Sequence, residues 1–225
     1  MRDVLERPRQ ADTVVHRVRT IAKRAAGEVV QFTWAAAIEL GAIGPHSRRA
    51  RRFGRFGDGS VICFPPNALF NEQYISIGEG TMFGPEITLS AGMVPGQQMV
   101  SDTVITVGDR CLFGKGSGIV GHLEIVIGDD VWTGHHVYIT DQNHGYEDLD
   151  LPIGTQMWHN EPVSIGDGSW LGHGAVVLPG SKIGRNVVIA AGAVVAGIEV
   201  PDYSVVAGVP ARVIRRYVDG VWKSV

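Results

Sequence analysis

Aliphatic residues recur at every sixth position through the C-terminal third of the chain. The series runs through Ile165, Leu171, Val177, Ile183, Ile189 and Val195 and, by the same count, Pro201, Ala207 and Val213. A second series, small or aliphatic, lies four places after most of these residues: Ser169, Ala175, Ser181, Val187, Ala193 and Val205. A period of six fits neither an α-helix nor an alternating β-strand. It predicts short strands joined by tight corners, with each turn of a coil stacked on the next.

The same phase appears earlier in the chain, with interruptions. Aliphatic or aromatic residues are followed directly by glycine at Ile77, Val107, Phe113 and Ile127. We expect these residues to point inward and to stack on their equivalents in the turns above and below, while glycine lets the corners close. Each turn then contacts only its neighbours, and the ends of the stack need caps. Cys111, four places after Val107, is therefore expected to be a packed thiol and not a nucleophile.

This pattern resembles the hexapeptide-repeat family over roughly Ile75–Arg216. Members of that family form left-handed parallel β-helices with three faces, one hexapeptide to a face. The resemblance implies an all-β fold: a left-handed parallel β-helix of hexapeptide repeats with an N-terminal helical segment and a catalytic loop excursion. The expected organisation is a helical and basic segment over residues 1–60, a β-helix over 61–216 with a loop at 140–162, and a tail over 217–225.

The first 60 residues follow a different pattern. Apolar residues from Val14 to Val29 mark one face of a helix, and a second helical segment is expected from Val30 to about Ile43. Five arginines follow, at positions 48, 49, 51, 52 and 55. They form either a charged turn beside a cap on the first coil or a contact for a phosphate-bearing acceptor or an anionic membrane surface. The sequence does not separate these interpretations.

Composition excludes several classes of protein. The formal net charge of -3 at pH 7 argues against nucleic acid as the main partner. No stretch reaches the roughly 18 uninterrupted apolar residues that a membrane span needs. Two cysteines make no disulfide framework, and the N-terminus carries no apolar signal region. We therefore expect a cytoplasmic protein.

The six-residue period is interrupted between Thr140 and Val163 by about two dozen mostly polar residues. This segment resembles the loop of the sugar O-acetyltransferases of the galactoside, maltose and exopolysaccharide type and, more distantly, of the xenobiotic acetyltransferases. A histidine on that loop is the general base of those enzymes, and His144 matches it by position. His159 is expected to hold the loop in place. The sequence does not select which carboxylate orients the base among Asp141, Glu147 and Asp148.

The stretch over residues 169–195 resembles the acyl-CoA groove of the same enzymes, where the pantetheine arm lies along small residues of neighbouring coils. Carried over, the groove residues are Gly172, His173 and Ala191. Coil packing explains the small residues equally well. The ending over residues 207–216 also matches the family, and its Arg212 and Arg215 are expected to meet the phosphates of CoA.

The chain departs from the family pattern at one place, near the expected site of the cofactor phosphates. Relatives commonly have Thr-Lys or Thr-Arg after the Val-Val pair, where this chain has Ala196-Gly197. A cation expected near the phosphates is therefore missing, and Lys182 or Arg185 is a candidate to replace it.

The resemblance as a whole implies an acyl-CoA-dependent acyltransferase that uses acetyl-CoA as co-substrate and needs no metal. The acceptor is expected to be a hydroxyl of a sugar or glycoconjugate. A homotrimer is also implied, with His144 of one chain facing the CoA groove of the next. Three alternatives stay open: an amine acceptor on an aminosugar or antibiotic, a noncatalytic repeat scaffold, and a zinc enzyme of the γ-carbonic-anhydrase type with ligands His122, His136 and His144.

Overall fold

The computed structural model describes residues 10–156 and 160–225, and the chain divides into two compact units, Met1–Gly41 and Ala42–Val225. The first unit contains the single helix α1 (Gln10–Gly41) of 32 residues. The expectation of two helical segments was wrong: no proline lies near Val29 and the single Gly27 does not end the helix, which continues to the residues just before Gly44-Pro45. No helix among the described residues is long and apolar enough to cross a membrane.

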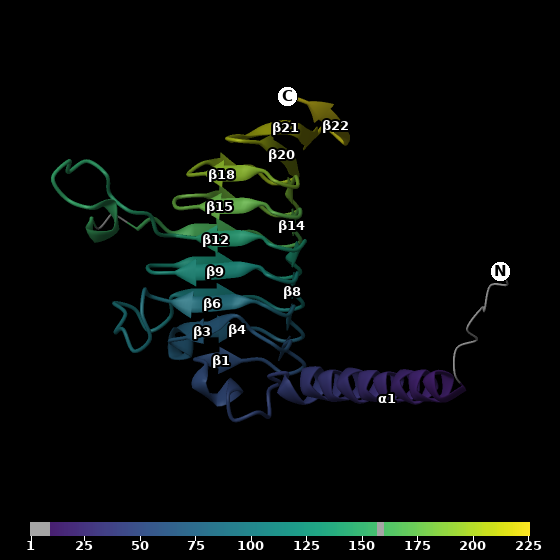
Figure 1. Ribbon diagram of the computed structural model, residues 1–225. Coiled ribbons are helices and arrows are strands. Elements are labelled where there is room, and N and C mark those ends of the chain that lie inside the picture. The colour runs from purple at the N-terminus through teal and green to yellow at the C-terminus, as the bar shows by residue number, and fades with distance from the viewer. Residues whose placement is uncertain (1–9, 157–159) are drawn as a thin grey trace. The chain divides into compact units, whose positions relative to one another are not determined.

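The second unit is a left-handed parallel β-helix whose strands form three sheets, as the sequence predicted (Figure 1). The seven-stranded sheet contains β1 (Arg55–Phe56), β4 (Ile75–Ile77), β7 (Ile105–Val107), β10 (Ile125–Ile127), β13 (Val163–Ile165), β16 (Lys182–Ile183) and β19 (Glu199–Val200). The nine-stranded sheet contains β2 (Val61–Ile62), β5 (Met82–Phe83), β8 (Leu112–Phe113), β11 (Trp132–Thr133), β14 (Trp170–Leu171), β17 (Val188–Ile189), β20 (Ser204–Gly208), β21 (Ala211–Val218) and β22 (Val221–Ser224). The six-stranded sheet contains β3 (Ala68–Phe70), β6 (Thr88–Ala91), β9 (Gly118–Gly121), β12 (Tyr138–Thr140), β15 (Val176–Leu178) and β18 (Val194–Ala196).

From Ile165 to Val195 the hexapeptide period determines the register between turns, and after Val195 the register changes. Ile165 pairs with Ile183, 18 positions later, as three hexapeptides per turn require. Ile183 then pairs with Val200 and Ile189 with Val206, each only 17 positions later. The strict period had placed Pro201 and Ala207 inward, and this was wrong. The last corner between the six-stranded and seven-stranded sheets is one residue shorter, so the inward residues are Val200 and Val206.

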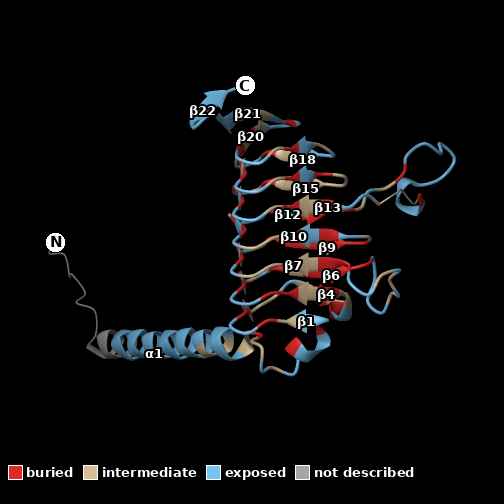
Figure 2. Ribbon diagram, turned by 180° about the vertical axis from the view of Figure 1, so that it is seen from behind, coloured by how far each residue is buried: buried red, intermediate tan, exposed pale blue. Residues whose placement is uncertain are grey.

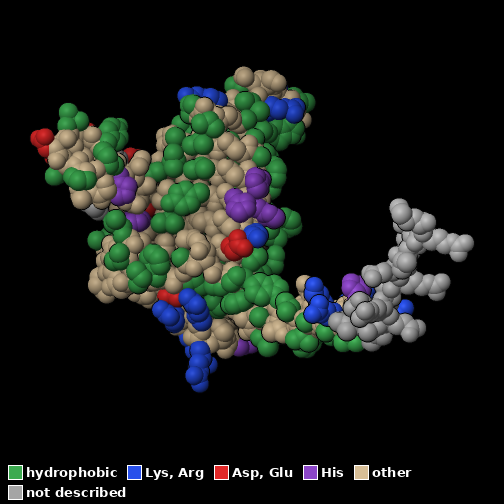
Figure 3. All heavy atoms as spheres, viewed as in Figure 1, with side chains coloured by type: hydrophobic (Ala, Val, Ile, Leu, Met, Phe, Trp, Pro, Cys, Tyr) green, Lys and Arg blue, Asp and Glu red, His purple; other side chains and the backbone are tan. Residues whose placement is uncertain are grey.

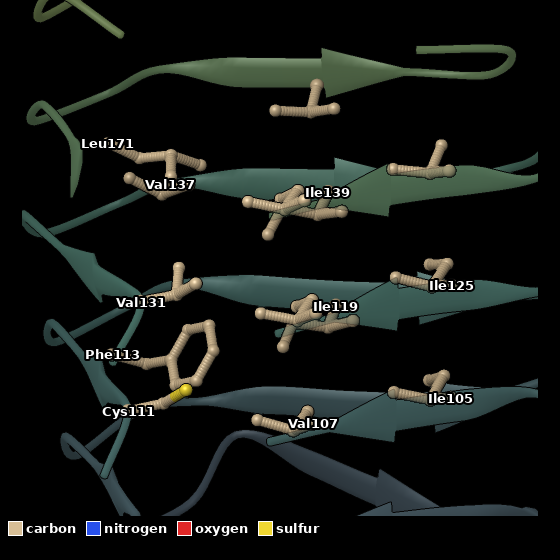
Figure 4. Close-up of a cluster of buried hydrophobic side chains, with 14 of the residues drawn as sticks. Ile105, Val107, Cys111, Phe113, Ile119, Ile125, Val131, Val137, Ile139 and Leu171 are labelled. Carbon is tan, nitrogen blue, oxygen red and sulfur yellow. The ribbon is translucent and has the colours of Figure 1, made fainter. Parts of the chain in front are cut away.

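The core consists of columns of inward side chains that run along the stack. Figure 4 shows aliphatic residues of successive turns in these columns, and Figure 2 shows the buried strands in red. Ile119 and Ile139 are fully buried, and the rings of Phe83 and Phe113 stack with centroids 4.8 Å apart. Cys111 is 1% exposed, which confirms it as a packed thiol, and burial raises its pKa to about 11.

The N-terminal end of the stack is closed by residues 42–60. Ile43 pairs with Ile62 as an isolated antiparallel bridge, and Ala50 in the 3-10 turn Ala50–Arg52 is buried. A second 3-10 turn, Glu72–Tyr74, carries Glu72, which is 1% exposed and lies 3.1 Å from the guanidinium of Arg52. Part of the arginine cluster is therefore a structural element of this cap, because a buried carboxylate needs a charged partner.

Two further arginines of the cluster also form ion pairs. The Nε atom of Arg49 lies 3.7 Å from Oε1 of Glu72, and Arg55 lies 3.8 Å from the carboxylate of Glu79. At the other end of the stack, β21 and β22 add an antiparallel hairpin to the nine-stranded sheet. Both ends of the coil are thus covered, as a stack of repeats requires.

Candidate active site

The long loops of the coil leave it at one corner, between the six-stranded and seven-stranded sheets (Figure 1). One joins β6 to β7. The catalytic loop, predicted over residues 140–162, joins β12 to β13 as residues 141–162. A short connection, residues 122–124, joins β9 to β10 one turn below the catalytic loop. We call this short connection, together with Asp141 and Glu161, the loop neck.

Asp141 holds the loop neck together. Its carboxylate is fully buried and accepts three backbone N–H groups, each at 2.7 Å, from His122, Leu123 and Glu124. Its own carbonyl oxygen accepts the N–H of Glu161 at 3.0 Å, which closes the base of the loop. Hydrogen bonds to a carboxylate are stronger than neutral ones, so this single side chain fastens the corner of the preceding turn to the start of the loop.

The outer part of the loop is organised by Gln156. Its Nε2 donates to the carbonyl oxygens of Asp148 and Leu151 at 2.7 and 3.0 Å, and its Oε1 accepts the N–H of Asp148 at 3.1 Å. The 3-10 turn Ile153–Thr155 precedes it. These bonds give the loop internal structure next to His144, although the chain there is largely exposed.

His144, the predicted base, is half-buried on this loop. Its backbone N–H donates to Oδ1 of Asn143 at 3.0 Å. Its Nδ1 atom is buried and has no hydrogen-bond partner among the described residues. His159 lies outside the described residues.

The three carboxylates expected as orienting partners accept backbone N–H groups. Asp141 binds the loop neck, Glu147 accepts the N–H of Tyr146 at 3.1 Å, and Asp148 accepts the N–H of Asp150 at 2.9 Å. No hydrogen bond joins any of the three to the ring of His144 within the described part of the chain.

The sequence connected His122 with His144 only as ligands of the alternative zinc site. The side chain of His122 is 7% exposed. Burial lowers its pKa, the nearby charge of Asp141 opposes that effect, and the charge of His144 adds to it. Its position in a short corner one turn before the loop was the available signal, since equivalent corners of successive turns lie above one another.

The predicted groove residues lie at a different corner, between the nine-stranded and six-stranded sheets. A Cβ atom on Gly172 would lie 2.5 Å from the backbone nitrogen of Ala191, so stacking of the turns requires glycine there. His173 and Ala191 are exposed on successive turns, and the N–H of Gly192 donates to the carbonyl oxygen of His173 at 2.9 Å. The corner thus presents small residues and backbone groups along the stack.

Three exposed histidines gather at this same corner, a cluster that the sequence did not predict. The ring of His173 lies 6.3 Å from that of His135 and 5.5 Å from that of His136, between centroids. Figure 3 shows histidine side chains grouped on this edge of the coil. The stacking of equivalent corners explains the cluster, because the N–H of Gly174 donates to the carbonyl oxygen of His135 at 2.9 Å.

The predicted phosphate-binding arginines lie on β21. Arg212 and Arg215 are exposed and face Ala207 and Val205 of β20 in the antiparallel register. Arg212 donates to the carbonyl oxygen of Ala211 at 2.8 Å. Both belong to the nine-stranded sheet, which leads into the groove corner.

The two candidate replacements for the missing cation lie elsewhere. Lys182 is on β16 of the seven-stranded sheet. Arg185 follows it, with its Nε 2.8 Å from Oδ2 of Asp202 and its guanidinium 5.3 Å from the ring centre of Tyr203. Neither lies at the groove corner, and Arg185 already has a partner.

The six-stranded sheet separates His144 from the groove corner within one chain. His135 and His136 precede β12, and Asp141 follows it. For the same reason His136 is not brought together with His122 and His144. No group of three or more histidine, cysteine, aspartate or glutamate residues in the described part of the chain is placed to hold a metal ion.

Comparison with known proteins places the repeats in a family. A family model described as bacterial transferase hexapeptide (six repeats) matches residues 162–197, and one described as hexapeptide repeat of succinyl-transferase matches residues 104–140. AntD, an N-acyltransferase from Bacillus cereus solved in complex with dTDP and 3-hydroxybutyryl-CoA, superposes with a TM-score of 0.59 over 74% of this chain and 84% of that chain. At 16% identity this likeness concerns the fold alone.

Curated relatives are more similar in sequence. A probable acetyltransferase of Mycobacterium tuberculosis is 41% identical over 108 residues, 48% of this chain, and the match spans only 36% of that protein. A putative lipopolysaccharide biosynthesis O-acetyl transferase of Escherichia coli K12 is 38% identical over 70% of this chain and 79% of its own length. The galactoside O-acetyltransferase of the same organism is 30% identical over 68% of each chain. The chain therefore belongs to the hexapeptide-repeat acyltransferases of the sugar O-acetyltransferase type.

Proposed function

We propose that the protein transfers an acyl group, most simply acetyl, from acyl-CoA to a hydroxyl group of a sugar or glycoconjugate. The observation that carries this proposal is the half-buried imidazole of His144, held on a loop whose neck is fastened by Asp141. The similarity to the two Escherichia coli O-acetyltransferases supports the choice of a hydroxyl acceptor.

His144 acts as the general base in this proposal. Its Nε2 accepts the proton of the acceptor hydroxyl while the oxygen attacks the thioester carbonyl. Backbone N–H groups meet the oxyanion that forms. The C–S bond then breaks, the imidazolium returns the proton to the thiolate, and the products are an ester and free CoA. The reaction requires no covalent enzyme intermediate, so both substrates are bound together.

The groove for the pantetheine arm is formed by the corner of Gly172, His173 and Ala191, with Arg212 and Arg215 near the phosphates. Small residues along the corner leave room for the arm, and exposed backbone groups can bind its amides. Because the six-stranded sheet separates this corner from His144 in one chain, the site is completed by a second copy of the chain. We infer a homotrimer, in which each groove meets the histidine loop of a neighbour.

The outward residues of the nine-stranded sheet support this assembly. In register, the outward column of that sheet is apolar from β2 to β20: Val61, Met82, Leu112, Trp132, Trp170, Val188 and Val205. The corresponding column of the seven-stranded sheet is mostly polar: Arg55, Ser76, Thr106, Val126, Ser164, Lys182 and Glu199. Trp132 and Trp170 are 55% and 48% exposed in one chain. A continuous apolar face of this kind is typical of a surface that another protein covers.

A transfer assay tests the proposal. Purified protein is incubated with acetyl-CoA and separate panels of sugars, glycoconjugates and aminosugars, and both CoA release and the mass of the product are followed. We expect an acetyl ester on a sugar hydroxyl, and His144→Ala should lower kcat by about 100- to 10,000-fold. His46→Ala, an exposed histidine in the N-terminal cap, is the matched control. Products acetylated only on amines would contradict the hydroxyl acceptor.

A further inference from the structure

The helix α1 exposes large apolar side chains, and Figure 2 shows most of the element as exposed. Ile21 is 66% exposed, Phe32 77% and Leu40 85%. A helix of a globular domain normally buries its apolar stripe against the core. Because α1 forms a compact unit of its own and leaves such side chains open to solvent, it presents a surface that suits a partner.

The exposed apolar residues follow the helical period. Seven of them are separated by three or four positions and so lie on one side of the helix, which we call the α1 stripe: Val18, Ile21, Ala25, Val29, Phe32, Ala36 and Leu40. Near Gly41 a second apolar row, Val30, Trp34 and Ile38, lies on the other side. The two sides of the helix therefore differ most between His16 and Gly27.

Cations flank the α1 stripe in this first half of the helix. Residues 16–27 contain four cations, Arg17, Arg19, Lys23 and Arg24, and no carboxylate. At about 100° per residue, Arg17 and Arg24 lie along one edge of the stripe and Arg19 along the other. Arginine lays its stem on apolar surface while its guanidinium stays in water. A stripe edged in this way matches a layer that is apolar inside and negatively charged at its boundary.

We propose that α1 lies along the surface of an anionic lipid bilayer, with the α1 stripe at the level of the upper acyl chains and the three arginines among the head groups. A basic amphipathic helix is typical of surface binding. The charged side chains from Arg17 to Glu28 fit an orientation along the bilayer, because a charge at its centre is costly. This role goes beyond the transfer chemistry and is independent of His144.

The charges favour a bilayer over a second copy of the chain as the partner of the stripe. In a closed cyclic assembly such as the proposed trimer, copies of α1 that pack about the axis run parallel. Their stripes would bring Arg17, Arg19 and Arg24 close to the same arginines of the neighbours, and residues 16–27 offer no carboxylate to pair with them. An anionic surface instead attracts each of these cations.

Sedimentation of the full chain with lipid vesicles tests the proposal. The vesicles are phosphatidylcholine alone and phosphatidylcholine with one third phosphatidylglycerol. We expect binding to the anionic vesicles that weakens as salt is raised. Each cation near the surface contributes about five-fold, so Arg17→Gln, Arg19→Gln and Arg24→Gln combined should lose about 100-fold. No binding of the wild type to the anionic vesicles, or equal binding to both kinds, would overturn the proposal.

A matched pair of substitutions separates the stripe from the charge. Ile21→Glu and Thr20→Glu change the net charge equally at adjacent exposed positions, but Thr20 lies outside the stripe, where its hydroxyl donates to the carbonyl oxygen of His16 at 2.9 Å. We expect Ile21→Glu to bind the anionic vesicles about 10- to 100-fold more weakly than Thr20→Glu, because one aliphatic side chain is no longer buried. Equal binding by the two variants would refute the role of the stripe.

Two further readouts distinguish the other outcomes. A lower oligomeric state of Ile21→Glu in sedimentation velocity without lipid would assign the stripe to contacts between copies and would overturn the proposal. Acetyl transfer to a soluble acceptor should be unchanged in Ile21→Glu, because α1 carries none of the residues proposed for transfer. Loss of vesicle binding with transfer intact supports the membrane role, whereas vesicle binding by a wild type without transfer counts against the proposed function alone.

Discussion

Substitution of Asp141 by asparagine should weaken the protein more than any other isosteric change in the loop. The carboxylate accepts the N–H of His122 on one oxygen and those of Leu123 and Glu124 on the other, each at 2.7 Å. An amide keeps only one oxygen. In its better orientation it retains the bonds to Leu123 and Glu124 and turns its own N–H₂ toward the N–H of His122.

The magnitude follows from the kinds of bond lost. A hydrogen bond to a charged group contributes about 1.5–3 kcal/mol, and a neutral one about 0.5–1.5 kcal/mol. Asp141→Asn loses one charged bond outright and converts two others into neutral ones. We expect the free energy of unfolding to fall by about 3–5 kcal/mol, near the upper end for single substitutions.

The assay is urea unfolding followed by circular dichroism, with amide hydrogen exchange of residues 122–124 measured alongside. Asp148→Asn is the matched control, because within the described residues that carboxylate accepts one exposed N–H, that of Asp150, at 2.9 Å. The control should lose less than about 0.5 kcal/mol. Equal losses of free energy in the two variants, or unchanged hydrogen exchange at residues 122–124 in Asp141→Asn, would show that the Asp141 carboxylate does not fasten the loop neck.

Three further predictions concern packing, ionisation and assembly. Gly172→Ala places a Cβ 2.5 Å from the backbone nitrogen of Ala191 and should cost about 1–3 kcal/mol by thermal unfolding, whereas Gly154→Ala, with nothing within 4 Å, should be neutral. The thiol of Cys111 has a pKa raised to about 11 from 9.0, so its contribution to stability is complete below pH 9 and is lost between pH 9 and 11. That loss, up to about 2.7 kcal/mol, should be absent in Cys111→Ala when urea unfolding is compared at pH 8 and 10.5. Trp132→Lys combined with Trp170→Lys should convert a trimer to monomers in sedimentation velocity, and an unchanged trimer would show that this face is not the interface.

The six-residue period predicted the architecture because every hexapeptide repeats the same physical requirement. One inward aliphatic residue and one small corner residue per face are enough to specify a coil, and register follows from stacking. The period failed at Val200 and Val206, where the strands are shifted by one residue because the preceding corner is shorter. Corner length depends on local backbone geometry, which the identity of the inward residues does not encode.

The arrangement of residues in the candidate site was harder to predict from the sequence than the fold. His144 was found through its position in the loop, but its relation to His122 and Asp141 depends on which corners lie above one another. Asp141 and residues 122–124 are brought together at the loop neck, which the irregular spacing of the middle turns conceals. The cluster of His135, His136 and His173 has the same origin, since two turns separated by a long loop meet at one corner.

Titration calorimetry with acetyl-CoA is the most informative test of an acyl-CoA-dependent transferase, because the donor site is used with every acceptor. We expect binding of about one acetyl-CoA per chain in the wild type, with similar affinity in His144→Ala, since the base does not hold the cofactor. Binding should weaken in Arg212→Ala combined with Arg215→Ala. Absence of acetyl-CoA binding by the folded wild-type protein would rule out the proposed acyl-CoA groove.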